Sequence, residues 1–263
     1  MTAPAATTDP HPEFDHASQA ATDGADVAAG AAADDASNDD GWLDDPQYRA
    51  AVVDLLGVLA YGELSAFERL AADAVMAPTL ADKSAVAAMA SAELRHFEAL
   101  RDRLVELDVD PSEAMTPFVA PLDAFHASTS PADWLEGVVK AYVGDGIAAD
   151  FYREIAATLD ARTRALVLHV SDTTGNARFA VDTVREAIAA DPRVAGRLAL
   201  WGRRLLGEAI SQAQRVAAER DGLTLLLVGG LDRPGADVVE LGQLFNRLTR
   251  AHSERMAALG LAA

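Results

Sequence analysis

The chain has 263 residues, half of them hydrophobic, and a formal net charge of −19 at pH 7, because 41 Asp and Glu residues outnumber 22 Lys and Arg residues. A surface of this sign repels polyphosphate, so generic nucleic-acid binding is not expected. The absence of cysteine excludes disulfides, thiolate metal sites, iron–sulfur clusters and cysteine nucleophiles. Any bound metal must therefore be held by carboxylates and imidazoles, which suit iron, manganese or zinc.

The first 41 residues differ in composition from the rest of the chain. Residues 1–41 hold nine acidic side chains and no Lys or Arg, among mostly Ala, Asp, Thr, Ser, Gly and Pro. Such a segment cannot bury enough apolar surface to fold, and it lacks the basic start and apolar run of a secretory signal. We expect a disordered acidic tail, then a helical bundle over 42–190, and a helical hairpin over 191–263 that packs on it. No stretch approaches the unbroken apolar length of a membrane span, so a cytoplasmic protein with no membrane contact is expected.

Apolar residues recur at three- and four-residue spacing through nearly all of the remaining chain, which predicts an all-α fold. The first helix is expected from about Asp45 to Val75, and a turn at Pro78 leads into a second that ends near Leu107. Residues 109–131 contain four prolines and show no helical period. They are expected to form a long crossover connection.

The later helices are expected at about 131–158, 160–190, 192–220 and 236–259. Ser130-Pro131 begins the first of these with an N-cap serine and a proline at the first helical position. Residues 223–235 are Gly- and Leu-rich and are expected to be a connector. Two short-linked helix pairs joined by one long crossover are typical of a ferritin-like four-helix bundle, to which the last two helices add a C-terminal hairpin.

Glu93 and His96 lie three residues apart, on an otherwise apolar face of the second helix. Burying a carboxylate and an imidazole there is costly unless a charge such as a metal ion compensates it. If the first two helices pair antiparallel about Pro78, Glu63 lies at the same height. A Glu-x-x-His pair facing a Glu from a neighbouring helix is the half-site of a di-iron carboxylate bundle. The alternative is a surface Glu and a hydrogen-bonded core His; Glu98 is expected to face solvent.

The second half-site is ambiguous. The same height rule puts Thr173 and Asn176 where a second acid-x-x-His pair would be, opposite Asp145. Thr and Asn are poor iron ligands compared with carboxylate and imidazole. Asp145, Asp150 and Glu154 interrupt an apolar run in the third helix, which makes each of them a candidate ligand.

A nearby pair offers a substitute for the missing ligands. His169 and Asp172 share a helical face with Asn176, and Asp150 would lie opposite them. A His-x-x-Asp pair could therefore replace the acid-x-x-His pair one turn away. The alternative is that His169 is an ordinary exposed or hydrogen-bonded helix histidine.

Three segments carry a resemblance to a known family: Ala60–Phe67, Ala92–Phe97 and Tyr142–Glu154. They resemble an actinobacterial ferritin-like family that is similar to the tRNA isopentenyladenosine hydroxylases, which are non-haem di-iron monooxygenases. The resemblance spans about residues 45–260, and Glu-x-x-His is its most specific element. It implies Glu63, Glu93 and His96 as iron ligands, together with one of Asp145, Asp150 and Glu154.

Two functions follow as alternatives. The first is an O₂-dependent hydroxylase or oxidase with two irons, or with a single iron or manganese, acting on a small molecule or a modified nucleoside. The second is a degenerate bundle that binds one metal or none and serves as a scaffold or interaction protein; Thr173 and Asn176 favour it. A homo-oligomer, specifically a dimer, is expected in either case.

Overall fold

The computed structural model describes residues 40–172, 174–228 and 238–263, and every regular element among them is helical. The all-α prediction is thereby confirmed. The chain divides into Met1–Asp40 and Gly41–Ala263. The predicted acidic tail lies outside the described residues except for its last two. The helices of 191–263 form one compact unit with those of 42–190.

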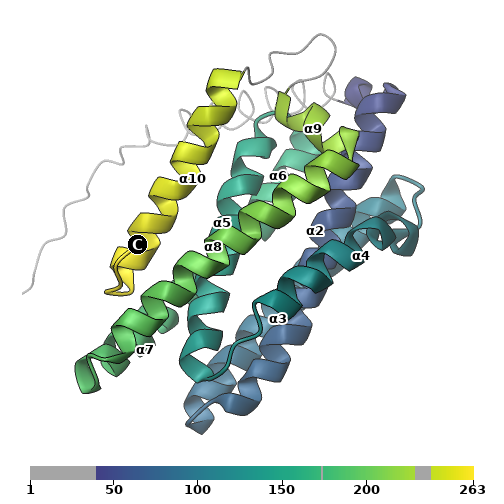
Figure 1. Cartoon of the computed structure of the whole chain (residues 1–263). Helices are drawn as coiled ribbons and strands as arrows, with labels where there is room; N and C mark the ends of the chain where they lie inside the picture. The colour runs from purple at the N-terminus through teal and green to yellow at the C-terminus, as the bar shows by residue number, and fades with distance from the viewer. Residues whose placement is uncertain (1–39, 173, 229–237) are drawn as a thin grey trace, which may run out of the picture. The chain divides into compact units, whose positions relative to one another are not determined.

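The long helices of this unit are shown in Figure 1 and are α2 (Pro46–Asp73), α3 (Leu80–Glu106), α5 (Trp134–Ala156), α8 (Val194–Glu219) and α10 (Val238–Ala258). The shorter elements are η1 (Asp40–Asp44), η2 (Ala74–Met76), α4 (Pro111–Ser128), α6 (Ala161–Val170), α7 (Thr174–Ala190) and α9 (Asp221–Val228). Helix α2 packs against α3, α4 and α9, while α5 packs against α7, α8 and α10. The bundle core therefore forms around α2 and α5.

Helix α2 begins where the Asp45 side chain accepts hydrogen bonds from the backbone N–H groups of Gln47 and Tyr48. By length and composition, Pro46–Met76 could cross a membrane, contrary to the expectation that no stretch comes near that limit. A buried core helix meets the same test, and Leu55 and Leu59 of α2 are fully buried. The apolar length of α2 thus reflects its place at the centre of the unit.

The predicted crossover at 109–131 is wrong in detail, because most of it folds as α4. Asp110 caps this helix by accepting from the N–H groups of Ser112 and Glu113, and the proline that follows Asp110 occupies the first helical position. Two prolines inside α4 each remove one backbone hydrogen bond, but packing outweighs that loss. At Gly57 of α2 a Cβ atom would lie 2.3 Å from the carbonyl oxygen of Ala114, so glycine permits the close approach of α4. The 223–235 connector is likewise helical at its start, as α9.

The predicted helix at 160–190 is interrupted in the structure. Helix α6 ends at Val170 and α7 begins at Thr174. The Ser171 hydroxyl donates to the carbonyl of Val167, and Arg153 of α5 donates to the carbonyl of Ser171 at 2.9 Å. The bond from Arg153 takes up the Ser171 carbonyl, which a continuous helix would have satisfied internally.

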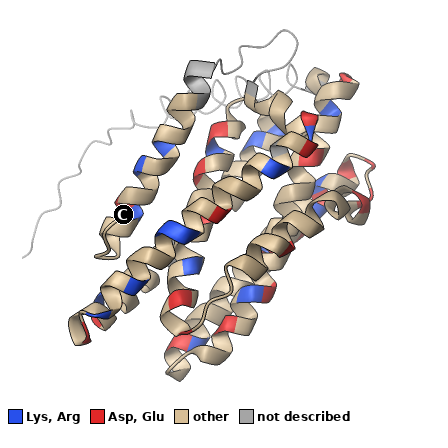
Figure 2. Cartoon of the chain, in the orientation of Figure 1, with Lys and Arg blue, Asp and Glu red and all other residues tan. Residues whose placement is uncertain are grey.

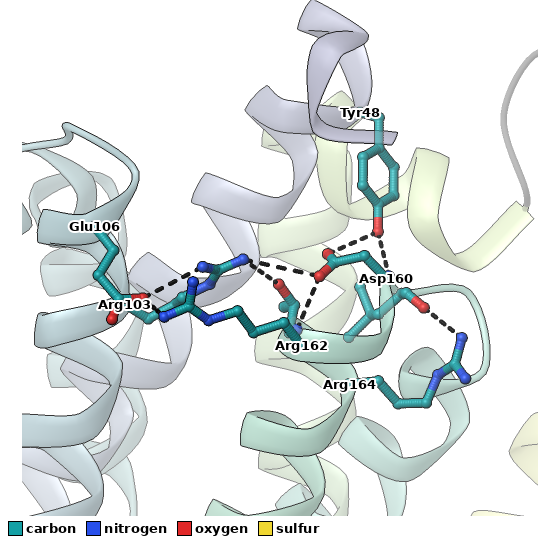
Figure 3. Close-up of polar contacts among 8 residues, drawn as sticks. Tyr48, Arg103, Glu106, Asp160, Arg162 and Arg164 are labelled. Atoms are coloured by element: carbon teal, nitrogen blue, oxygen red, sulfur yellow. Dashed lines mark hydrogen bonds and ion pairs between the residues drawn. The ribbon is translucent and has the colours of Figure 1, made fainter. Parts of the chain in front are cut away.

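A buried polar network fixes the start of α6 against α2 and α3 (Figure 3). The Tyr48 hydroxyl donates to Asp160 Oδ2 at 3.2 Å and accepts from the Asp160 N–H at 2.7 Å. The Asp160 side chain also caps α6 through the Thr163 N–H, and Arg103 of α3 lies 3.8 Å from Asp160 Oδ1. Arg103 in turn pairs with Glu106 at 3.3 Å. Three helices are thus held together at one point.

Arginines of α8 and α10 attach these helices to α5. Arg197 lies 2.7 Å from Asp133 and also pairs with Glu136, and Arg247 binds both carboxylate oxygens of Glu154 at 2.6 and 2.7 Å. In the view of Figure 2 the acidic and basic residues are interspersed along the helices. Arg197 and Arg247 therefore serve contacts between helices.

Candidate metal centre

Glu63, Glu93 and His96 meet between α2 and α3, as the height argument predicted. His96 Nδ1 lies 3.4 Å from Glu63 Oε2 and 3.7 Å from Glu93 Oε2. One ligand atom from each of the three side chains falls within 4.8 Å of the others. Two antiparallel helices supply them, with Glu93 and His96 one turn apart on α3. These three side chains, called here the Glu–Glu–His cluster, form a compact set of donors.

Unpartnered polar atoms show that the Glu–Glu–His cluster fits a cation. Glu63 Oε2 and His96 Nδ1 are buried, and neither has a hydrogen-bond partner in the described part of the chain. Buried polar atoms are normally satisfied, and each exception calls for an explanation. Carboxylate oxygen and imidazole nitrogen are suitable ligands for iron, manganese or zinc. An ion among the three side chains would satisfy both atoms at once.

The protonation states of the cluster reflect its burial. Burial raises the pKa of Glu63 well above its usual value, and the neighbouring Glu93 adds to this effect. Burial also opposes ionisation of Glu93, but the close approach of His96 and Glu63 outweighs it and lowers the Glu93 pKa. The carboxylates of Glu63 and Glu93, at 3.4 and 3.7 Å from Nδ1, raise the pKa of His96 to about 10. Without metal the cluster therefore holds protons that a bound cation would displace.

Asp145 of α5 belongs to the same region. Burial raises the pKa of its carboxyl group well above the usual value, the charge of Glu93 raises it further, and His96 opposes the shift. The carboxyl group thus lies within electrostatic reach of both α3 residues. Among the three acids predicted on this helix, Asp145 is the one whose pKa is shifted by Glu93 and His96, although its carboxyl group is not among the ligand atoms that lie within 4.8 Å of one another.

The other two acids of α5 have arginine partners. Asp150 Oδ2 accepts from Arg255 of α10 at 2.5 Å, and Asp150 Oδ1 lies 3.1 Å from Arg153. Glu154 is bound by Arg247 of α10, as described above. A carboxylate held by a guanidinium is less free to bind a metal, so the structure places Asp150 and Glu154 in contacts between α5 and α10. A ligand role for them stays a prediction.

The predicted residues of the fourth helix are only partly placed. His169, at the end of α6, is exposed, yet its ring centroid lies 6.1 Å from that of His96, with the rings at 73°. Asp172 is exposed at the break between α6 and α7. Thr173 and the side chain of Asn176 lie outside the described part of the structure. Of these four predicted residues, His169 is therefore the one that the structure places near the Glu–Glu–His cluster.

Tyr152 was not predicted as a site residue. Burial raises the pKa of its hydroxyl group, and the charge of Glu63 raises it further. A Cβ atom on Gly62 would lie 4.0 Å from this hydroxyl, which places Tyr152 beside α2 next to Glu63. The signal was present in the sequence, because Tyr152 follows Asp145 by seven residues and so shares its helical face.

A small apolar pocket lies one helical turn from the cluster along two helices. Its lining includes Met89 of α3 and Ala141 of α5, each four residues before Glu93 and Asp145 respectively. The other lining residues are Leu70, Asp73, Val86, Trp134, Gly137, Val138, Phe179 and Ala180. Apart from one acid, these side chains offer only apolar contacts and the indole of Trp134, and the cavity that they enclose, about 10 Å³, has room for about one water molecule.

Comparison with known proteins identifies a family and similar solved structures. A family model described as "Ferritin-like domain, actinomycetes" matches residues 46–230. A solved structure titled "Protein 19 with aldehyde deformylating oxidase activity from Synechococcus" aligns with a TM-score of 0.63 and 21% sequence identity, over 82% of this chain and 93% of that chain. At that identity the likeness concerns the fold alone. No curated protein matches the sequence.

Proposed function

The chain belongs to the actinomycete ferritin-like family, and from this premise we propose that it is an iron-dependent oxidase that uses O₂. The observation that carries the proposal is the pair of buried, unpartnered atoms, Glu63 Oε2 and His96 Nδ1, which lie 3.4 Å apart. Without a metal, protonated His96 and the two carboxylates offset one another's charge at 3.4 and 3.7 Å, and a cation bound among the three side chains would replace the His96 proton in that role. Family membership bears out the predicted ferritin-like fold.

In this proposal Glu63, Glu93 and His96 hold iron, and Asp145 completes the ligand set from α5. Iron bound there would supply the redox chemistry that activates O₂, which no side chain of this chain can supply. Before iron binds, Glu63 and His96 must release their protons, because only the carboxylate and the neutral imidazole are ligands. Tyr152 lies close enough to Glu63 for the charge of the carboxylate to raise the pKa of its hydroxyl group.

The apolar pocket lies one turn from the metal position along α3 and α5, but its cavity of about 10 Å³ has room for about one water molecule and holds no organic substrate as it stands. The apolar substrate class in this proposal therefore rests on the structural neighbour, which has aldehyde deformylating oxidase activity by its title. The acidic composition disfavours a tRNA substrate, and a homodimer stays a prediction.

Iron content is the measurement that tests this proposal. We expect the purified full-length protein, expressed with added iron, to contain iron, and Glu93→Ala to lose most of it. Glu98→Ala is the matched control, because Glu98 lies on the same helix but is exposed to solvent. Two irons per chain would indicate that additional ligands complete a second position.

A different iron content would contradict the proposal. If Glu93→Ala, Glu98→Ala and the unchanged protein contained the same amount of iron, the Glu–Glu–His cluster would not be the metal site. Complete absence of metal from well-folded protein would instead support the alternative of a degenerate bundle acting as a scaffold. Oxygen consumption in the presence of apolar aldehydes then separates an active oxidase from a protein that only binds metal.

A further inference from the structure

The Glu–Glu–His cluster lies just below the surface of the protein, and its imidazole is the least covered of its three groups. The side chains of Glu93, Glu63 and His96 are 10%, 13% and 18% exposed. Glu63 Oε2 and His96 Nδ1, the two atoms without partners, are themselves buried. A metal ion arrives surrounded by water molecules, and it must lose some of them before these buried atoms can bind it. The proposed function therefore requires a route for the ion from solvent into the cluster.

His169 of α6 is exposed to solvent beside His96. Its ring centroid lies 6.1 Å from that of His96, and the two rings are inclined at 73°. The His169 side chain makes no hydrogen bond or ion pair with any described residue, so no described group competes for its ring nitrogens. A neutral imidazole is the commonest metal ligand in proteins. His169 thus offers an ion in solvent the same kind of ligand that His96 offers inside the cluster.

The distance between the two rings fits a single ion that contacts both. Two imidazoles that bind one ion through nitrogen at about 2.1 Å place their ring centroids roughly 4.5–6.5 Å apart, depending on the angle at the metal. The observed separation of 6.1 Å is within this range. One ion can therefore contact both rings while the exposed His169 changes only its side-chain rotamer.

The backbone that carries His169 is held in place, although the ring is exposed. The Asp172 N–H donates to the carbonyl of His169 at 3.3 Å, and Arg153 of α5 donates to the carbonyl of Ser171 at 2.9 Å. These bonds fix the last turn of α6 and attach it to α5. They therefore keep the His169 ring within reach of His96.

We propose that His169 is the capture ligand of the metal centre: it binds a divalent cation from solvent, passes it to the Glu–Glu–His cluster and then withdraws. This inference rests on the proposed function, because it takes the cluster as the place where the metal finally binds. The net charge of −19 supports it, since an acidic surface raises the local concentration of cations. Ligands are exchanged on the ion, His96 and Glu63 release the protons that they hold without metal, and no oxidant or reductant is needed.

A capture ligand and a permanent ligand differ in their effects on metal-binding rates. Because the ion leaves by the same route through which it arrives, loss of a capture ligand lowers the association and dissociation rates by the same factor and leaves the affinity unchanged. Loss of a permanent ligand weakens the affinity and mainly raises the dissociation rate. Measurement of both rates therefore separates the two roles of His169.

We would mix the metal-free full-length protein with Co²⁺, which takes the same kinds of ligand as ferrous iron, and follow the visible absorption of the bound ion by stopped flow. Dissociation is followed after addition of excess EDTA. In His169→Gln we expect both rates to fall by about tenfold and the affinity to stay the same. His169→Asp should restore part of both rates, because a carboxylate also binds the ion. Leu168→Ala is the matched control, since Leu168 is the neighbouring exposed side chain of α6, and it should leave both rates unchanged.

Three results would overturn the capture role. Equal rates in His169→Gln and the unchanged protein would remove it while leaving the cluster as the metal site. A weaker affinity with faster dissociation in His169→Gln would make His169 a permanent ligand. Rates lowered as much by Leu168→Ala would trace the effect to the end of α6 rather than to the imidazole. Absence of Co²⁺ binding by the unchanged protein, or equal binding by Glu93→Ala, would instead refute the proposed metal site together with this inference.

Discussion

Asp145 and Asp150 lie five residues apart on α5 and differ in their neighbours. Asp145 is within reach of the charges of Glu93 and His96, whereas Asp150 is bound by Arg255. We expect Asp145→Asn to weaken iron binding by at least about tenfold, because an amide is a poorer ligand than a carboxylate. Asp150→Asn should retain iron. Equilibrium titration of the metal-free protein with ferrous iron, without oxygen, measures both.

A different result would revise the ligand set. If Asp150→Asn lost iron while Asp145→Asn kept it, the α5 ligand would be Asp150, and the bond from Arg255 would have to break on metal binding. Equal affinities for both variants and the unchanged protein would leave α5 without a ligand. Far-ultraviolet circular dichroism of each variant controls for loss of helix.

At the scale of residues, the sequence predicted that Glu63, Glu93 and His96 meet, but it did not separate the candidate ligands on α5. Glu93 and His96 follow from a three-residue spacing on one helix, and Glu63 from a turn of known position. The choice among the α5 acids depends on Arg247 and Arg255, which are about 100 residues further along the chain. Helical spacing within α5 contains no information about these partners.

At the scale of elements, α10 packs on α5 through a contact that glycine makes possible. A Cβ atom on Gly146 would lie 2.5 to 3.0 Å from Cδ, Nε and Cζ of Arg255, the residue that binds Asp150. We expect Gly146→Ala to displace this guanidinium and to destabilise the protein by about 1–3 kcal/mol, the usual cost of overpacking. Denaturant unfolding, with its midpoint and slope, measures the change.

Gly144→Ala is the matched control on the same helix. A Cβ atom there meets nothing within 4 Å, so only helix propensity changes, and alanine is favoured over glycine by up to about 1 kcal/mol. We therefore expect opposite signs for substitutions two residues apart. Stabilisation of equal size by both would show that Arg255 yields freely and that its contact with α5 contributes little.

The elements that the sequence failed to predict share a physical cause. Pro117 and Pro121 favour a break in 109–131, yet α4 forms because it packs closely on α2 at Gly57. The break between α6 and α7 depends in part on Arg153 of α5, which binds the carbonyl of Ser171. Both outcomes depend on contacts between distant segments, whereas the long amphipathic helices follow from local periodicity.

At the scale of the whole molecule, one half-buried and one buried histidine, His126 and His252, couple folding to pH. Burial lowers the pKa of His126 and of His252 from 6.5 to about 4. Below pH 6.5 the unfolded chain binds protons that the folded chain does not, so stability falls as pH drops from 6.5 toward 4. Each histidine contributes at most about 3 kcal/mol to this loss, less where solvent screens it. Unfolding free energies measured across this range test the slope.

His252→Leu isolates one contribution to this slope. His252 is 2% exposed, and neither ring nitrogen has a hydrogen-bond partner among the described residues. A leucine of similar size removes a buried donor that lacks a partner, which costs about 1–3 kcal/mol in the native protein. We expect higher stability at pH 7 and a shallower decline toward pH 4. A slope equal to that of the unchanged protein would show that His252 does not titrate in this range.

The end of α6 at Val170 has an electrostatic consequence for the metal centre. A helix carries a partial negative charge, equivalent to about half an elementary charge, at its C-terminus. His169 is in the last turn of α6, and its ring lies 6.1 Å from that of His96. The interruption of the helix places the negative pole of α6 and the positive pole of α7, which begins at Thr174, in the same short stretch of chain, and Arg153 binds the Ser171 carbonyl there. The opposite charges offset one another, so the charge at the Glu–Glu–His cluster is set by its own side chains rather than by the helix ends.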